Sequence, residues 1–197
     1  PGKFATPRFE DFKDMDQVML YMKEVVEAIR AELPPGVRFV IHGRSSGSSF
    51  AAEFGHRFPH LVDELVLMSM PYPDAGFFQR NLDRMDEVAR QDGYGNMHWD
   101  WIHWVKDVAL QSTWHKTSVP FAGIKTVFLK GSNDNEMLND ERLTYEAIGR
   151  RHPHITYMEI AGAGHEVTKM DFSVKKDKRF AASVIAQLLD YLLNERP

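Results

Sequence analysis

Ser45 stands in the pattern Gly43-x-Ser45-x-Gly47, between a β-branched apolar run and a segment with helical character. A serine in this pattern occupies a sharp turn from strand to helix, which pushes its hydroxyl into the open. Glycine is expected on both sides because the turn is strained and crowded. The following helix directs its first backbone N–H groups to the same spot, where they can stabilise negative charge. The pattern therefore predicts a serine nucleophile that needs a base.

The segments around this motif have the order that the motif requires. Residues 38–41 are expected to form a short buried strand, and residues 48–58 a helix whose small side chains face a sheet. Pro59 then opens a turn, and residues 64–69 are expected to form a second strand. This order places Ser45 at the carboxyl end of a parallel strand.

Residues 37–71 resemble the nucleophile-elbow unit of the α/β-hydrolase superfamily, in its serine esterase and lipase branch, and the resemblance extends to the end of the chain. It implies a three-layer α/β/α fold with a parallel sheet, as a single domain over residues 1–197. Ser48 stands where the family commonly has glycine, and Arg44 stands where histidine is frequent. We expect Arg44 to favour an anionic group in the substrate site.

The resemblance also implies an acid and a base in two later loops. The expected strand 124–129 runs into a Gly-x-x-Asp loop like the acid-bearing loop of the family, which makes Asp134 the candidate acid. The expected strand 155–160 runs into a glycine-rich loop like the family's histidine loop, which makes His165 the candidate base. The order Ser45, Asp134, His165 is the one expected for this fold.

The chemistry requires these residue types. A serine hydroxyl is a poor nucleophile at neutral pH unless a base takes its proton. His165 would be that base, because imidazole titrates near neutral pH. Asp134 would orient the ring and stabilise the imidazolium. The backbone N–H of Ser46 would supply one oxyanion donor.

Other interpretations of these residues stay open. Ser45 could be an ordinary turn serine, and Asp134 could be a turn former, since Asn and Asp favour turns. Asp74 is the main rival acid, because some members of the resembled family keep their acid after the preceding strand. Asn133 and Asp140 are weaker alternatives.

The remaining histidines give no metal site. His42, at the end of the first strand, is expected to be packed or solvated rather than catalytic. His98, His103 and His115 lack the close pairing of a metal-binding helix. We therefore expect no metal, and catalysis by a serine, a histidine and an aspartate requires no cofactor.

Composition excludes several functional classes. The 197 residues carry a net charge of −4 with acids and bases mixed along the chain, so no basic footprint for nucleic acid is present. No apolar run approaches the length of a membrane helix, and no membrane partner is expected. The absence of cysteine is compatible with the cytoplasm, which we favour while the compartment stays open.

Residues 72–122 are too long for a simple crossover between strands. In the resembled family such an insertion forms a cap over the active site. Trp99, Trp101 and Trp104 are candidate substrate-binding residues that would wall an apolar pocket. Equally, the aromatic residues of this insertion could simply pack the cap onto the body.

The region before the serine motif departs from the family. Residues 14–32 have the spacing of an amphipathic helix, but the strands that precede this helix in the family are not evident. The strand at 37–42 should be central, and alone it would leave an apolar edge unpaired. We therefore expect a non-covalent N-terminal companion polypeptide that supplies the remaining strands, or an incomplete sequence arising from proteolytic processing or fragmentation.

The sequence thus predicts hydrolysis of a carboxylic ester, with a small apolar or aromatic substrate, through an acyl-enzyme on Ser45. The same triad could serve a thioester, a peptide, a carbon–carbon bond or acyl transfer. A ligand-binding pseudoenzyme subunit is an alternative from another class.

Overall fold

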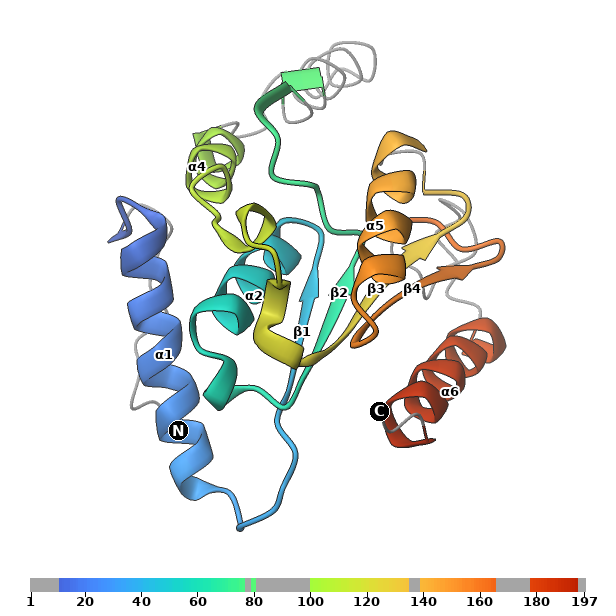
Figure 1. The fold of residues 1–197 in the computed structure, drawn as a ribbon, viewed down its shortest axis with the longest axis horizontal. Helices are drawn as coiled ribbons and strands as arrows, with labels where there is room; N and C mark the ends of the chain where they lie inside the picture. Colours follow the sequence, from blue (N-terminus) through green and yellow to red (C-terminus); the bar gives the residue numbers. More distant parts are fainter. Residues whose placement is uncertain (1–10, 77–78, 81–99, 135–138, 166–177, 195–197) are drawn as a thin grey trace.

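The computed structural model describes residues 11–76, 79–80, 100–134, 139–165 and 178–194. Within them, four parallel strands form a sheet in the order β1-β2-β3-β4 (Figure 1). The strands are β1 Val40–Arg44, β2 Glu64–Met68, β3 Lys125–Gly131 and β4 Ile155–Ile160. In register, Leu67 lies between Gly43 and Phe128. The carboxyl ends of the parallel strands share one edge of the sheet, and the residues that follow β1, β3 and β4 lead to Ser45, Asp134 and His165.

In the described residues, helices and short helical turns precede, connect and follow these strands. The helices are α1 Met15–Glu32, α2 Ser46–Arg57, α4 Asp100–Ala109, α5 Asn139–Arg151 and α6 Lys178–Asn194. The helical turns are η2 Pro59–Leu61, η3 Trp114–Lys116 and η4 Pro120–Gly123. None of the helices in the described part is both long and apolar enough to cross a bilayer.

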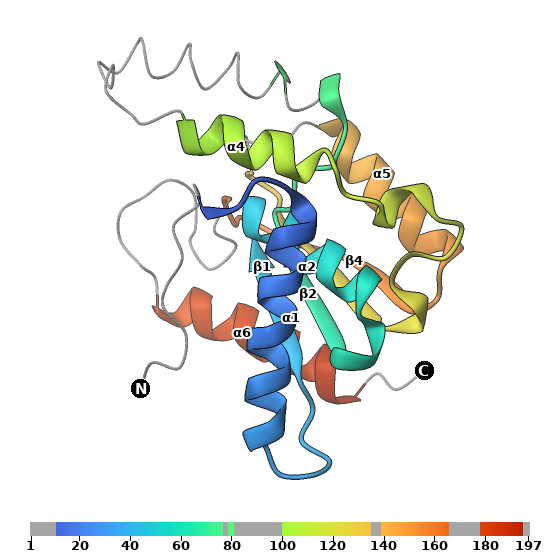
Figure 2. The ribbon, with the colours of Figure 1, turned by 90° about the vertical axis from the view of Figure 1, so that its left-hand side faces the viewer.

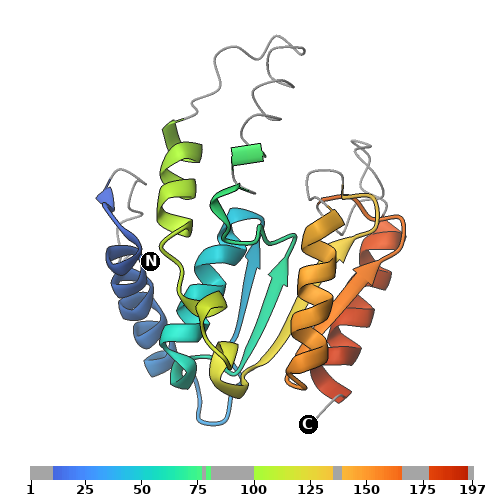
Figure 3. The same cartoon turned by 45° about the horizontal axis from the view of Figure 1, so that its top comes forward.

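The side chains of β2 show how the layers form, because successive residues of a strand point to opposite faces. Leu65 and Leu67 join a core cluster with side chains of α1, α2 and α5, whereas Val66 and Met68 cluster with side chains of α6. Figures 2 and 3 show the same division, with α2 and α5 on one side of the sheet and α6 on the other. The predicted three-layer α/β/α arrangement is confirmed.

Helix α2 lies close against the sheet, because several of its buried residues are small. Ala51 and Ala52 are buried at 2% and 0% exposure. A Cβ atom at Gly55 would lie 2.5 Å from Leu65 Cδ1, so only glycine allows this approach without a shift. The predicted small-residue face of this helix is confirmed.

Helix α1 packs on α2 and begins where its sequence provides a cap. The Asp14 side chain accepts a hydrogen bond from Gln17 N at 2.9 Å, which satisfies one of the free N–H groups of the first turn. Met15 and Met19 are buried at 0% and 1% exposure. The helix predicted over residues 14–32 is confirmed.

Strand β1 differs from its neighbour in burial. Val40 is 40% exposed, whereas every residue of β2 is buried. Within the described ranges, β1 pairs with β2 alone and forms an edge of the sheet. The expectation of a buried first strand is therefore wrong: β1 is mostly exposed, and its outer edge has no strand partner within these ranges.

Candidate active site

Ser45 lies on the turn between β1 and α2 and has a strained backbone. Its φ of 51° and ψ of −130° lie outside the regions that L-residues usually occupy. Its N–H donates to Met68 O at 2.8 Å, and its side chain makes no capping hydrogen bond to α2. A non-glycine residue in such a conformation costs about 1–3 kcal/mol and is most often found at functional sites.

The two glycines of the motif differ in what they do. A Cβ atom at Gly43 would lie 2.5 Å from Ser48 Cα, so glycine is needed there for the close approach of strand and helix. A Cβ atom at Gly47 would meet nothing within 4 Å. The expectation of crowding on both sides is therefore right for Gly43 and wrong for Gly47, which lies exposed in the first turn of α2.

The serine at position 48, where the resembled family commonly has glycine, is fully buried and contributes a contact of its own. Its hydroxyl donates to Met68 O at 2.8 Å, the same carbonyl that receives the Ser45 N–H. Two donors from the turn thus converge on the end of β2. This departure from the family pattern anchors the turn.

Asp134 and His165 come together as the sequence predicts. His165 Nδ1 lies 3.0 Å from Asp134 Oδ1 and 3.1 Å from Asp134 Oδ2. The Asp134 side chain is fully buried and that of His165 is 17% exposed. A proton on Nδ1 allows both carboxylate oxygens to accept, and this tautomer carries its lone pair on Nε2.

The charge on Asp134 is stabilised where it lies. Burial alone would raise the pKa of this carboxyl, but the hydrogen bond and charge of His165 lower it, as do a hydrogen bond from Ser69 and the charge of Lys130. The net result is a lowered pKa for Asp134. The carboxylate is therefore ionised at neutral pH and available to orient an imidazole.

Close backbone contacts hold the acid loop against the histidine loop. Asn133 N donates to Ala163 O at 2.8 Å. A Cβ atom at Gly131 would lie 2.3 Å from both Ala163 O and Gly164 O. The glycine of the Gly-x-x-Asp loop is therefore required for the approach that brings Asp134 to His165.

The rival acids lie elsewhere. Asp74 is exposed, its N–H donates to Tyr72 O at 2.8 Å, and its charge adds to burial in raising the pKa of Tyr72. Asn133 is exposed, with Nδ2 3.5 Å from Gly162 O. Asp140 lies in α5. Within the described residues, the carboxylate in contact with the His165 ring is that of Asp134.

The predicted oxyanion donor and anion-binding residue flank Ser45. Ser46 is the first residue of α2, and the first N–H groups of a helix have no partner within the helix. Arg44 is the last residue of β1 and is exposed. His42, expected to be packed or solvated, is exposed on β1.

Two of the three tryptophans predicted for the substrate site lie on helix α4. Trp104 lies on α4, where its Nε1 donates to Phe12 O at 2.8 Å and its ring lies 6.0 Å from that of Phe50. Trp101 lies in the same helix. Trp99 falls outside the described residues. A fourth tryptophan, Trp114, is fully buried in the core.

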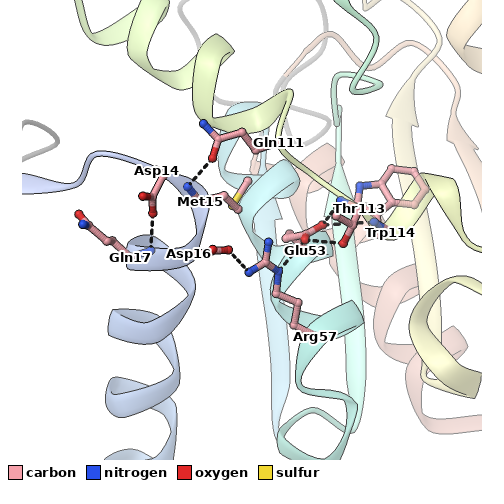
Figure 4. Close-up of polar contacts among 9 residues, drawn as sticks. All are labelled: Asp14, Met15, Asp16, Gln17, Glu53, Arg57, Gln111, Thr113 and Trp114. Atoms are coloured by element: carbon pink, nitrogen blue, oxygen red, sulfur yellow. Dashed lines mark hydrogen bonds and ion pairs between the residues drawn. The ribbon is translucent and has the colours of Figure 1, made fainter.

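Sequence reasoning missed Glu53, a buried carboxylate on α2 (Figure 4). It accepts hydrogen bonds from Arg57 Nε at 2.7 Å, Thr113 N at 2.7 Å, Thr113 Oγ1 at 2.8 Å and Trp114 N at 3.2 Å. Arg57 Nη1 in turn bonds to Asp16 on α1 at 2.5 Å. This network links residues 113–114, near the end of the segment 72–122, to α2, the helix that follows Ser45. A charged residue within an otherwise small-residue helix face was the signal that could have found it.

No group of side chains in the described ranges has the composition of a metal site.

No family model matches the chain, and no curated protein matches it.

Solved structures do resemble it. An α/β-hydrolase enzyme from a sediment metagenome of the Mar Chica lagoon, Morocco, has a TM-score of 0.58 and 18% identity over 91% of this chain and 72% of that chain. A thermophilic esterase from Thermogutta terrifontis has a TM-score of 0.55 and 17% identity over 96% and 76% of the two chains. A meta-cleavage product hydrolase has a TM-score of 0.53 and 17% identity, with the same two coverages of 96% and 76%.

The chain therefore has the α/β-hydrolase fold, as the sequence predicts. It spans 72% to 76% of the length of these three structures. At this level of identity the similarity defines the architecture, and the chemistry has to be argued from the site itself.

Proposed function

We propose that the protein is a serine hydrolase that cleaves carboxylic esters of small apolar or aromatic molecules, with Ser45 as nucleophile, His165 as base and Asp134 as orienting acid. The observation that carries the proposal is the contact of His165 Nδ1 with both oxygens of a buried carboxylate, at 3.0 and 3.1 Å. A carboxylate in this position holds an imidazole in the tautomer that can accept a proton at Nε2.

In the proposed reaction the Ser45 hydroxyl attacks the ester carbonyl while His165 Nε2 takes its proton. The carbonyl oxygen becomes an oxyanion that the N–H of Ser46 stabilises. The tetrahedral intermediate then collapses, the C–O bond to the alcohol breaks, and His165 returns the proton to the leaving oxygen. Water attacks the acyl-enzyme in the same way and releases the acid. Asp134 remains ionised throughout, in keeping with its lowered pKa.

The substrate side of the proposal rests on the residues around Ser45. Arg44 lies exposed next to the nucleophile and would attract an anionic group of the substrate. Trp99, Trp101 and Trp104 would contribute an apolar wall. The segment 72–122 would form the cap that carries this wall. We propose an ester rather than a thioester, peptide or carbon–carbon bond; the structural neighbours include esterases and a meta-cleavage product hydrolase, so a comparison of substrates has to test this choice.

Labelling with a fluorophosphonate, read by intact and peptide mass spectrometry, tests this proposal directly. We expect a single adduct on Ser45 in the unmodified chain and none in Ser45→Ala. Hydrolysis of a p-nitrophenyl ester should fall by about a million-fold in Ser45→Ala, because removal of the nucleophile disables the whole triad. Unchanged turnover in Ser45→Ala would overturn the proposal. Tight ligand binding without any adduct would favour the binding-subunit alternative.

We also propose a companion polypeptide that pairs with the outer edge of β1. Three side chains of this strand, those of Val40, His42 and Arg44, are exposed, whereas β2 is buried along its whole length. An apolar strand with an open edge is a template for pairing with another segment. The helices beside the sheet also expose apolar side chains, namely Leu20 and Ile29 on α1 and Ile185, Leu189 and Leu193 on α6.

The intact mass spectrum of the same sample, recorded under native conditions, tests the companion. A second polypeptide that leaves only under denaturing conditions would support it. A monodisperse chain of 22.7 kDa that is folded and active would contradict it.

A further inference from the structure

Ser69, which sequence reasoning did not single out, follows directly after β2 and has an unusual backbone. Its φ is 47°, in the left-handed region that favours glycine, and the residue is only 1% exposed. Its N–H donates to Leu129 O at 2.8 Å, which fixes the turn to the end of β3. Because glycine would adopt this conformation without strain, the serine side chain has to be explained by what its hydroxyl contacts.

The Ser69 hydroxyl reaches the loop that carries the candidate base. Its Oγ donates to His165 O at 2.9 Å. The two residues lie 96 positions apart in the chain, so this bond joins the end of β2 to the histidine loop. A buried hydroxyl bonded to a main-chain carbonyl holds the backbone of the residue, and therefore the origin of the imidazole side chain.

The same hydroxyl also acts on the candidate acid. Burial raises the pKa of Asp134, while hydrogen bonds from His165 and from Ser69 are among the causes that lower it. The hydroxyl that bonds to His165 O thus also favours the charged form of Asp134. Ser69 thus stands between the backbone of the base and the side chain of the acid.

Ser45 and Ser69 share an unusual backbone conformation, but their side chains make different contacts. Both follow a strand, both have positive φ, at 51° and 47°, and both donate their N–H to the next strand at 2.8 Å. In this conformation the Ser45 side chain makes no capping hydrogen bond to α2, whereas the Ser69 side chain bonds to the histidine loop.

We infer that Ser69 is a positioning residue that fixes His165 against Asp134 through the main chain of the histidine loop. The inference rests on the proposed function, in which His165 is the base. Ser69 acts through that residue, because it holds the imidazole at the angle at which Asp134 accepts from Nδ1.

Ser69→Ala and Ser69→Gly test the inference. Both remove the hydroxyl and its hydrogen bond, but Ser69→Gly also removes the backbone strain, so it should be more stable than Ser69→Ala. We expect kcat for a p-nitrophenyl ester to fall about tenfold to a hundredfold in both variants, with KM unchanged, because a displaced base slows only the chemical step. If the activity follows stability instead, so that Ser69→Gly is fully active, the inference is overturned.

The matched control is Thr126→Val. Thr126 is fully buried, and its hydroxyl donates to a backbone carbonyl, Ile124 O, at 2.9 Å, but it lies at the opposite end of the sheet. This variant removes a comparable hydrogen bond far from His165. We expect it to keep kcat while its midpoint of urea unfolding falls, because a buried hydrogen bond is lost.

A second readout does not depend on catalysis. The two ring-nitrogen chemical shifts of His165, assigned with His165→Gln, report which nitrogen carries the proton. We expect the Nδ1-protonated tautomer in the original chain and a mixture of tautomers in Ser69→Ala. Identical shifts in the two proteins would overturn the inference. If Ser45→Ala retained full activity, the proposed function would fail, and these shifts alone would decide the role of Ser69.

Discussion

Glu53 and Asp134 are both fully buried carboxylates with lowered pKa values, and they differ in what surrounds them. Burial raises the pKa of both. In Glu53 it is outweighed by hydrogen bonds from Thr113 and Arg57, and in Asp134 by the hydrogen bond and charge of His165 first of all. Arginine and backbone N–H groups cannot change their protonation near neutral pH, whereas histidine can.

This difference distinguishes a carboxylate that stabilises the fold from a carboxylate that is a candidate for catalysis. The oxygens of Glu53 accept from four donors on α2 and on the segment 113–114, so its charge is balanced by permanent partners (Figure 4). Asp134 is paired with a group that can take up a proton and release it again. The partners, rather than the burial, therefore indicate the role of each acid.

Of the substitutions that compare the two acids, Asp134→Asn should have the largest effect, and it should lower the rate of hydrolysis. An amide in this position favours the wrong imidazole tautomer, so kcat/KM for ester hydrolysis should fall by about ten thousand-fold while the fold is retained. Steady-state kinetics with a p-nitrophenyl ester, together with circular dichroism, would measure both.

Asp74→Asn is the matched control for the acid. Asp74 is exposed, and its charge acts on Tyr72 and His115. We expect this variant to keep kcat/KM within about twofold, as surface substitutions usually do. A large loss in Asp74→Asn with none in Asp134→Asn would move the acid to position 74.

Glu53→Gln should have the converse effect. Removing one partner of a buried ion pair destabilises a protein by about 3–5 kcal/mol, and the new amide would also face backbone N–H groups with a donor of its own. We expect a lower midpoint of urea unfolding and an unchanged kcat per folded molecule. Because Glu53 lies on the helix that follows Ser45, a fall in kcat with unchanged stability would break the separation of the two acids.

Gln17→Ala serves as a control for the loss of a polar side chain nearby. The Gln17 side chain accepts from Lys13 N at 2.9 Å, and this bond is exposed. Its loss should change the free energy of unfolding by less than about 0.5 kcal/mol. Destabilisation equal to that of Glu53→Gln would show that the contacts of Glu53 with Arg57, Thr113 and Trp114 add nothing specific.

Local sequence patterns and the resemblance predicted the fold and the pairing of Asp134 with His165, because strand, turn and glycine signals lie within short stretches. They placed the first strand at 38–41 instead of Val40–Arg44 and began the next helix at residue 48 instead of Ser46. The turn that carries Ser45 is therefore shorter than predicted, because Arg44 still pairs with Met68 in the sheet and α2 already begins at Ser46.

The contacts of Glu53 and Ser69 could not be predicted in this way. They join residues 60 and 96 positions apart, and no local spacing records such a contact. The crowding at Gly43 and the open space at Gly47 are likewise set by how α2 approaches β1. Sequence patterns thus predict which loops meet, and the packing decides which side chains hold them there.

The smallest effect should appear in the pH dependence of stability. A carboxyl whose pKa is lowered by folding stays charged in the folded state while the unfolded chain takes up a proton. Its contribution is therefore complete above the unfolded value, about 4, and is lost as the pH falls through the folded pKa. Both Glu53 and Asp134 have lowered pKa values, so both should contribute to acid unfolding.

Urea unfolding of the original chain, Glu53→Gln and Asp134→Asn at a series of pH values below about 5 measures these contributions. Each variant lacks one such carboxyl, so its free energy of unfolding should fall less steeply with falling pH than that of the original chain. The pH profile of ester hydrolysis should change in Asp134→Asn alone, since Glu53 has no titratable partner in the reaction. Parallel stability curves for all three proteins would mean that neither acid is held in its charged form by the fold.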